Sequence, residues 1–234
     1  MIIELKDVWY KYEGSKKWAL QGVSVSFREG ETVFIIGHNG SGKTTLLKLA
    51  SFILKPVHGK VYVDHQDFWD LDEEIKLRVR RNVVYVHEKP VILRGSVIYN
   101  VIYPLILRGY SEDQATEIAM KILEKLGIED LAKMNAKKLS AGQLKLISIA
   151  RAFAIKPKII FLDEPFVHLD KERKMVLIEI IKEEICNGRG VVLTSHGDYL
   201  RYIDPIKIIV LENGKIIEGD NHNHQSEVLK VYSP

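Results

Sequence analysis

Residues 37–44 read G-H-N-G-S-G-K-T, and this spacing of glycines, a lysine and a threonine suits the binding of phosphates. Glycines allow a backbone in which successive N–H groups point inward around an anion. A helix that begins near Lys43 would add about half a positive charge at its N-terminus. The Lys43 ammonium would reach the terminal phosphates of a nucleotide, and the Thr44 hydroxyl would bind Mg²⁺. The motif therefore predicts a site for a nucleotide and its metal ion.

The segments on either side of this motif are those that a phosphate site needs. Residues 32–36 form an apolar run typical of a buried parallel strand, and residues 43–52 have the pattern of a helix. A strand before the glycines and a helix after them favour a phosphate site over an ordinary glycine-rich turn. The residues expected to contact the nucleotide here are Gly37, His38, Asn39, Gly40, Ser41, Gly42, Lys43, Thr44 and Thr45.

Two adjacent carboxylates, Asp163 and Glu164, follow a second apolar run at residues 159–162. The carboxyl end of a buried strand is where an α/β sheet places its ligand. Asp163 suits a contact with Mg²⁺, directly or through water, and Glu164 suits the general base for an attacking water molecule. The alternative is that both acids merely begin a turn before Pro165; the phosphate motif makes this the weaker interpretation.

Strand and helix patterns alternate along most of the chain. Residues 96–154 are instead helical throughout, with helix-capping sequences at Ser111 and Ser140. The pair Asn213-Gly214 predicts a tight hairpin near the end of the chain. This order predicts an α/β fold with a mostly parallel sheet and a helical subdomain at about residues 96–154. Strands are expected at residues 2–12, 22–27, 59–64, 82–86, 158–162, 190–194, 206–211 and 215–218, and a further helix at 171–185.

Composition excludes several classes of protein. The 234 residues are 46% hydrophobic, which is enough for a globular core in one domain. The 34 basic and 31 acidic residues balance too closely to indicate a nucleic-acid partner. The single cysteine, Cys186, excludes an internal disulfide framework. The longest apolar, uncharged stretch, residues 95–107, is shorter than the ~18–20 residues of a membrane-spanning helix.

Three further segments, together with the two motifs, resemble the ATP-binding-cassette (ABC) family over essentially the whole chain. Residues 139–143, L-S-A-G-Q, resemble the family signature. Residues 166–170 resemble the loop that ends in aspartate after the acid pair, and residues 194–196 resemble the segment with the switch histidine. The resemblance implies a P-loop NTPase core, an N-terminal antiparallel β subdomain and an inserted α-helical subdomain. It also implies one ATPase domain that spans residues 1–234.

The resemblance further implies how ATP would be bound. In the family, two cassettes pair head to tail and enclose two ATP molecules. Each ATP would contact the phosphate loop of one subunit and Ser140, Gly142 and Gln143 of the other. Asp170 would also belong to the nucleotide site, and His196 would contact the γ-phosphate.

The resemblance assigns the stacking on adenine to Tyr12. Base stacking on an aromatic ring is worth ~1–3 kcal/mol and tolerates any base. Three other aromatic residues lie nearby in the sequence and leave alternatives open: Trp9, Tyr10 and Trp18.

The chain departs from the family pattern at two positions. Ala141 stands where the family usually has glycine, and one added methyl group beside a phosphate should be tolerated. His87 stands in the place of a glutamine that contacts Mg²⁺ and the attacking water in the family. A neutral imidazole can bind a metal ion or accept one hydrogen bond. His87 is therefore expected to have a catalytic and metal-binding role, unless it points away and Glu88 or a water fills its place.

The leading hypothesis is the ATP-binding and ATP-hydrolysing subunit of a transporter, at the cytoplasmic face of the cell membrane, with separate integral membrane subunits. A faint likeness of the segment from Pro90 to Gly109 favours import, and oxyanions as the substrate. The alternative is a soluble ABC ATPase such as the iron–sulfur cluster assembly type. A DNA-repair type is disfavoured, since no long heptad pattern separates the phosphate loop from the signature. A non-catalytic cassette would lack Glu164 or His196.

Overall fold

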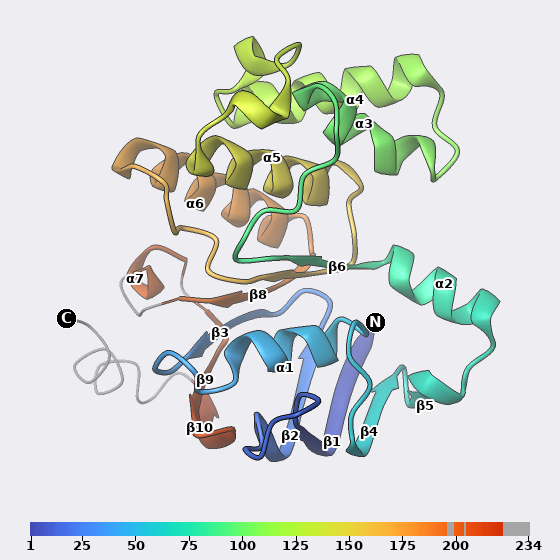
Figure 1. The fold of residues 1–234 in the computed structure, drawn as a ribbon, viewed down its shortest axis with the longest axis vertical. Helices are drawn as coiled ribbons and strands as arrows, with labels where there is room; N and C mark the ends of the chain where they lie inside the picture. Colours follow the sequence, from blue (N-terminus) through green and yellow to red (C-terminus); the bar gives the residue numbers. More distant parts are fainter. Residues whose placement is uncertain (196–198, 204, 222–234) are drawn as a thin grey trace.

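The computed structural model describes residues 1–195, 199–203 and 205–221, which form two sheets and a group of helices (Figure 1). A six-stranded sheet has the order β10-β9-β3-β8-β7-β6, with every neighbouring pair parallel except β9 and β10. Its strands are β3 (Thr32–Ile36), β6 (Val83–Val86), β7 (Ile159–Leu162), β8 (Gly190–Thr194), β9 (Lys207–Glu212) and β10 (Lys215–Asn221).

Both faces of this sheet are buried, which explains why its central strands are continuous apolar runs. Val33 and Ile35 of β3 face one hydrophobic core, whereas Phe34 and Ile36 face the other. This alternation follows from the two-residue period of a strand. The sheet therefore separates two cores, one under helices and one under the second sheet.

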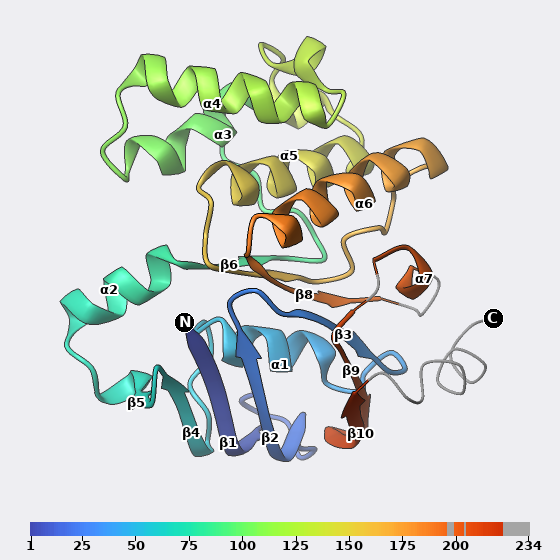
Figure 2. The same cartoon turned by 180° about the vertical axis from the view of Figure 1, so that it is seen from behind.

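The second sheet is antiparallel and has the order β2-β1-β4-β5. Its strands are β1 (Ile2–Tyr10), β2 (Leu20–Arg28), β4 (His58–Val63) and β5 (Gln66–Asp67). Helix α1 (Lys43–Ala50) packs between this sheet and β3, with Leu46, Leu47 and Leu49 fully buried (Figure 2). The expected antiparallel N-terminal part is confirmed.

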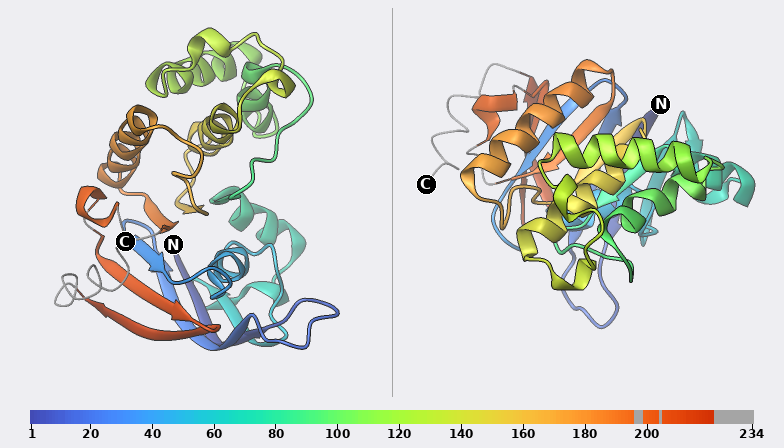
Figure 3. Two further views of the ribbon diagram at one scale, coloured as in Figure 1. Left: turned by 60° about the vertical axis from the view of Figure 1, so that its left-hand side comes forward. Right: turned by 90° about the horizontal axis from the view of Figure 1, so that it is seen from above.

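Helices cover the opposite face of the six-stranded sheet, so that the two cores lie on either side of it (Figure 3). Helices α5 (Ala141–Ala154) and α6 (Lys171–Cys186) lie on the sheet, whereas α3 (Val97–Ile106) and α4 (Glu112–Lys125) pack on α5 farther from it (Figure 1). The short helix α7 (Leu200–Ile203) precedes β9. Both predicted capping boxes are present, at Ser111 with Gln114 and at Ser140 with Gln143. The described part of the chain also contains three 3₁₀ turns: Phe68–Asp70, Glu129–Leu131 and Ala136–Lys138.

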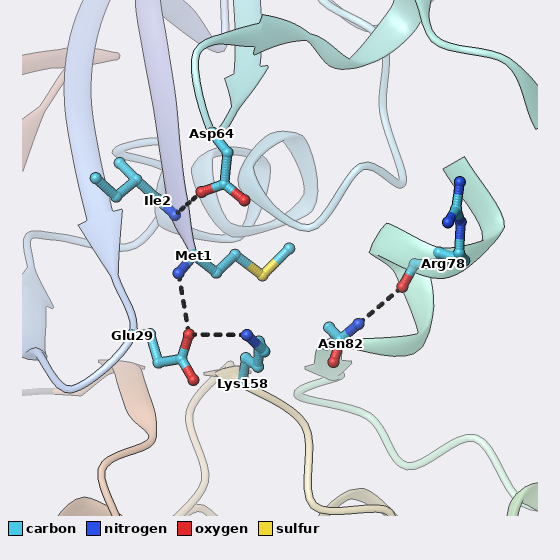
Figure 4. Close-up of polar contacts among 7 residues, drawn as sticks. All are labelled: Met1, Ile2, Glu29, Asp64, Arg78, Asn82 and Lys158. Atoms are coloured by element: carbon cyan, nitrogen blue, oxygen red, sulfur yellow. Dashed lines mark hydrogen bonds and ion pairs between the residues drawn. The ribbon is translucent and has the colours of Figure 1, made fainter. Parts of the chain in front are cut away.

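Helix α2 (Glu73–Arg81) was not predicted from the sequence and projects beside β6 (Figure 1). None of its residues is buried, so it lacks the apolar stripe that would have revealed it. Asn82, the residue that caps its C-terminus, donates from its side chain to the Arg78 carbonyl (Figure 4). Nearby, Glu29 accepts from the Met1 amine and pairs with Lys158, which ties the two sheets together (Figure 4).

The ends of several elements differ from the expected ones. Helix α1 stops at Ala50 rather than at residue 52, because Phe52 adopts a positive φ of 60° and ends the helical geometry. The predicted tight hairpin is confirmed, since Asn213 and Gly214 have φ of 48° and 77°, as a type I′ turn requires. Among the described helices, none is long and apolar enough to cross a membrane.

Candidate functional site

The glycine-rich loop lies between β3 and α1, as its sequence predicts. Lys43 is the first residue of α1, and its ammonium donates to the carbonyls of Gly37 (2.7 Å) and His38 (3.3 Å). A Cβ on Gly37 would lie 2.1 Å from the Leu211 carbonyl oxygen, so only glycine fits between the loop and β9. The buried Ser41 hydroxyl has no hydrogen-bond partner in the described part of the chain. The loop is thus preformed around a lysine and retains a polar atom that an anion could satisfy.

A cavity of about 500 Å³ opens over this loop. Its wall combines the phosphate loop with the acid pair, although more than a hundred residues separate them in sequence. Gly37 and His38 are outside the wall and act through the carbonyls that hold Lys43. The predicted site residues in the wall are Tyr12, Asn39, Gly40, Ser41, Gly42, Lys43, Thr44, Thr45, Asp163 and Glu164.

The two acids are positioned by different means. Asp163 is buried, with the Tyr85 hydroxyl donating to its Oδ2 (2.7 Å) and the Thr194 hydroxyl to its Oδ1 (2.9 Å). Glu164 has a positive φ of 44°, a strained conformation for a residue with a side chain, and its N–H donates to Thr194 Oγ1 (2.8 Å). The structure therefore adds Tyr85 and Thr194 to the site; their signal would have been two polar residues in otherwise apolar strands.

Charges in the cavity act on one another. Burial lowers the pKa of Lys43, although the carboxylates of Glu164 and Asp163 oppose that shift. Burial also raises the pKa of the Tyr85 hydroxyl, and the charge of Asp163 raises it further, so Tyr85 remains a hydrogen-bond donor at neutral pH. The site thus places one cation opposite carboxylates, across a space lined by backbone N–H groups and hydroxyls.

The residues Thr44 and Asp163 fit the binding of Mg²⁺. A hydroxyl and a carboxylate in one wall are the hard oxygen ligands that Mg²⁺ takes, together with phosphate oxygens. Among the described residues, no three His, Cys, Asp or Glu side chains group closely enough to hold a metal ion alone. Any Mg²⁺ here would share its coordination with the nucleotide.

Adjacent residues after β6 face different cavities. Glu88 lines the cavity of the phosphate loop, whereas His87 lines a second cavity together with Val91, Pro104 and Arg151. The His87 ring packs edge-on against Tyr85, with 4.5 Å between ring centres. Burial lowers the pKa of His87, and the charge of Lys48 lowers it further. The structure thus places Glu88, rather than His87, with the phosphate loop and the acids.

Lys145, on α5, is a buried cation that the sequence analysis missed. Its relative exposure is 0%, and its ammonium donates to the carbonyls of His87, Glu88 and Asp163. Burial lowers the pKa of Lys145 to about 8, with the charge of Asp163 opposing the shift, so the ammonium remains mostly protonated at neutral pH. A lysine among the apolar residues of this helix was the sequence pattern that could have indicated a buried cation.

Tyr12 lies over the start of α1. Its hydroxyl lies 3.1 Å from Thr45 Oγ1, and its ring packs edge-on against Tyr10. Trp18, by contrast, packs against Trp9 and is not part of the cavity wall. The geometry favours Tyr12 over Trp18 as the aromatic residue that meets a bound base.

The signature residues lie apart from this cavity. Ser140, Gly142 and Gln143 are not in its wall, and neither is Asp170. Ser140 and Gln143 cap α5 through reciprocal hydrogen bonds of 3.3 and 2.9 Å, and Asp170 caps α6 by accepting from the Arg173 N–H. One chain does not bring the signature to its own phosphate loop. His196 lies outside the described residues.

Comparisons with known proteins agree with the motifs. The family model described as ABC transporter matches residues 20–167. The tungstate uptake system ATP-binding protein TupC of Peptoclostridium acidaminophilum is 33% identical over 222 residues, which are 94% of this chain and 99% of that protein. The lipoprotein-releasing system ATP-binding protein LolD of Hyphomonas neptunium is 34% identical over 206 residues, with coverages of 85% and 88%.

Solved structures give the same result. A dimeric post-hydrolysis state of an ATP-binding cassette bound to ADP and Pi superposes with a TM-score of 0.84 and 30% sequence identity. The match covers 94% of this chain and 98% of that one.

Proposed function

The chain belongs to the ABC transporter family as an ATP-binding subunit, and we propose that it hydrolyses ATP to drive the import of an oxyanion through separate membrane-spanning subunits. The main support for ATP hydrolysis is that Lys43 and the phosphate loop line the same cavity as Asp163 and Glu164. We treat residues 1–234 as one ATPase domain, with the helices of about residues 96–154 as its helical subdomain.

The proposal assigns a role to the residues whose side chains or backbone can contact the nucleotide. Backbone N–H groups of residues 39–44 bind the β- and γ-phosphates, and Lys43 exchanges its carbonyl partners for phosphate oxygens. Glu164 accepts a proton from the attacking water, and its fixed backbone aims the carboxylate. Tyr12 stacks on the base. His196 contacts the γ-phosphate.

Thr44 and Asp163 would hold Mg²⁺. The ion would neutralise charge that develops on the phosphate oxygens. Tyr85 and Thr194 keep the Asp163 carboxylate in one orientation for this contact. Glu88 adds a third carboxylate to the wall of the cavity and is the better candidate than His87 for a contact with the ion or its water.

A second copy of the chain completes the site. Ser140 is exposed at the N-terminus of α5, where free N–H groups and the helix dipole favour an anion. Because the signature is absent from the chain's own cavity, Ser140, Gly142 and Gln143 would contact ATP held by a partner, in a head-to-tail dimer. Asp170 would lie near the same contact. The dimeric cassette with ADP and Pi supports this arrangement.

Membrane subunits are the second class of partner. Helix α3 exposes Tyr99, Tyr103 and Ile106, which recur at helical spacing and form an apolar strip. Such a strip suits a protein partner, and we propose that it meets the membrane subunits from the cytoplasmic face. Import of an oxyanion follows from the likeness to TupC, whose name states tungstate uptake.

Glu164→Gln tests the proposed hydrolysis. Loss of the positioned base should lower turnover by about 10²–10⁴-fold while ATP binding persists. The uncleaved ATP should then hold two chains together, which size-exclusion chromatography with Mg-free ATP would detect. A monomer that binds ATP would contradict the dimer, and unchanged turnover would contradict the role of Glu164.

The substrate is tested on the complex purified with its membrane subunits. ATP turnover in proteoliposomes should rise with tungstate or molybdate and their binding protein, and not with an amino acid. Co-purification with a soluble scaffold in place of membrane subunits would overturn the transport proposal.

A further inference from the structure

The segment 87–95, here called the linker, joins β6 to α3 without helix or strand of its own. Polar side chains of the helices hold its backbone. Asn100 of α3 accepts from the Leu93 N–H (2.8 Å) and donates to the Leu93 carbonyl (3.2 Å). Arg151 of α5 donates to the Val91 carbonyl. The backbone of Val91 and of Leu93 is therefore bonded to the helices.

Lys145 differs from these two residues because its bonds reach the sheet as well. Its ammonium donates to the carbonyls of His87 (3.0 Å), Glu88 (3.1 Å) and Asp163 (2.9 Å). An ammonium has three N–H donors, and here each has its own acceptor. One side chain thus joins α5, the start of the linker and the end of β7.

The three carbonyls belong to segments that carry the chemistry. Val86 and Leu162 are paired across β6 and β7, and the Asp163 N–H donates to the Val86 carbonyl (3.0 Å). The residues that follow these paired strands, Glu88 on one and Asp163 on the other, line the same cavity. Lys145 bonds the backbone carbonyls of both residues and so fixes the spacing between Glu88 and Asp163.

Resting on the proposed ATPase function, we propose that Lys145 is a positioning residue for hydrolysis that locks the Glu88 side of the cavity to the Asp163 side and both to helix α5. Ser140 caps the N-terminus of the same helix. A shift of α5 on contact with a partner chain would therefore reach the acids through Lys145. The Lys43 ammonium bonds the carbonyls of Gly37 and His38, and the Tyr12 hydroxyl lies beside Thr45. The phosphate-loop and base contacts therefore do not use the three bonds of Lys145, which are here called the joint.

Lys145→Met tests the joint, because methionine fills a similar volume without a donor. Hydrogen–deuterium exchange should become about tenfold faster in two peptides together, one covering residues 86–93 and one covering 161–168. Turnover at saturating ATP should fall about tenfold or more, since small misplacements of catalytic groups have effects of this size. The KM for ATP should change less than about threefold, because Lys43 and the phosphate loop are untouched.

Two further variants separate positioning from general stability. Lys145→Gln keeps amide N–H donors and should restore part of the turnover and of the exchange protection in both peptides. Arg151→Met removes a half-buried cation of the same helix, whose hydrogen bond within the described residues goes to the Val91 carbonyl. Exchange should therefore rise in the linker peptide alone, and turnover should stay within about twofold. If Lys145→Met does not fold, the same measurements on Lys145→Gln and Arg151→Met are compared instead.

The exchange measurement does not depend on hydrolysis. Faster exchange confined to the linker, or a uniform rise over the whole chain, would overturn the joint. A raised KM with unchanged turnover would overturn its role in positioning. A wild-type chain without ATPase activity would refute the proposed function, while the paired exchange response would still establish the joint.

Discussion

The phosphate loop and the linker both follow strands of the six-stranded sheet and border the same cavity, yet they are held in different ways. The phosphate loop contains its own restraints, since its glycines allow the turn and Lys43 bonds the carbonyls of Gly37 and His38. The linker contains none of its restraints, which come from Asn100 and Arg151 and, above all, from Lys145. A loop of the first kind is a local motif, whereas one of the second kind depends on the packing of distant helices.

The largest effect is expected from a substitution that disrupts the phosphate loop itself. In Gly37→Ala the new Cβ would meet the Leu211 carbonyl oxygen at 2.1 Å, with φ at +153°, so the loop and β9 must separate. We expect a loss of about 3 kcal/mol in unfolding free energy and loss of nucleotide binding. Gly40→Ala is the control, because nothing lies within 4 Å of its Cβ and only φ is strained. Urea unfolding and a nucleotide titration measure both; equal losses would contradict the close approach of β9.

The next effect concerns the base-stacking residue at the edge of the same loop. Tyr12→Ala should weaken nucleotide binding by about 1–3 kcal/mol, the stacking contribution, with little change in turnover at saturating ATP. Trp18→Ala should leave the affinity unchanged, since Trp18 is not in the cavity wall. Equilibrium titration with ATP compares the two. The reverse result would assign the stacking to Trp18.

A smaller effect distinguishes the two neighbouring residues of the linker. Glu88→Gln removes a negative charge from the cavity, so ATP without Mg²⁺ should bind more tightly, by about 1 kcal/mol, and Mg²⁺ should increase the affinity less. His87→Gln should leave this dependence on Mg²⁺ as it is, because His87 lines the other cavity. Titrations with ATP in EDTA and in Mg²⁺ supply the ratio. A change in His87→Gln alone would restore His87 as the metal contact.

The smallest effect is the titration of His87. Its pKa is lowered by burial and then by Lys48, so the folded chain binds the proton less readily than the unfolded chain. Stability from this residue is therefore present above the unfolded pKa of about 6.5 and is lost as the pH falls toward the lower folded value. Urea unfolding between pH 7.5 and 5 should show a steeper loss in the wild type than in His87→Gln. Parallel curves would mean that His87 titrates as a solvated residue.

Elements that depend on neighbouring residues were predicted correctly, whereas features that depend on distant contacts were not. The strands at residues 32–36 and 159–162 and the caps at Ser111 and Ser140 depend on neighbouring residues, and the structure has them as expected. Helix α2 and the direction of His87 depend on other causes. The first buries no residue, and the second involves contacts with distant residues, since the His87 carbonyl accepts from Lys145 and its ring packs in a cavity lined by Pro104 and Arg151.

The sequence by itself determined the phosphate loop, the acid pair and the α/β class, because glycine geometry, helix capping and apolar periodicity act over a few residues. Only the tertiary structure decided that Glu88 shares the cavity with Asp163, that Tyr85 and Thr194 orient its carboxylate, and that a buried lysine joins helix α5 to both. These contacts link residues about 20 to 80 positions apart in the chain, and their energies depend on burial, which no local pattern specifies.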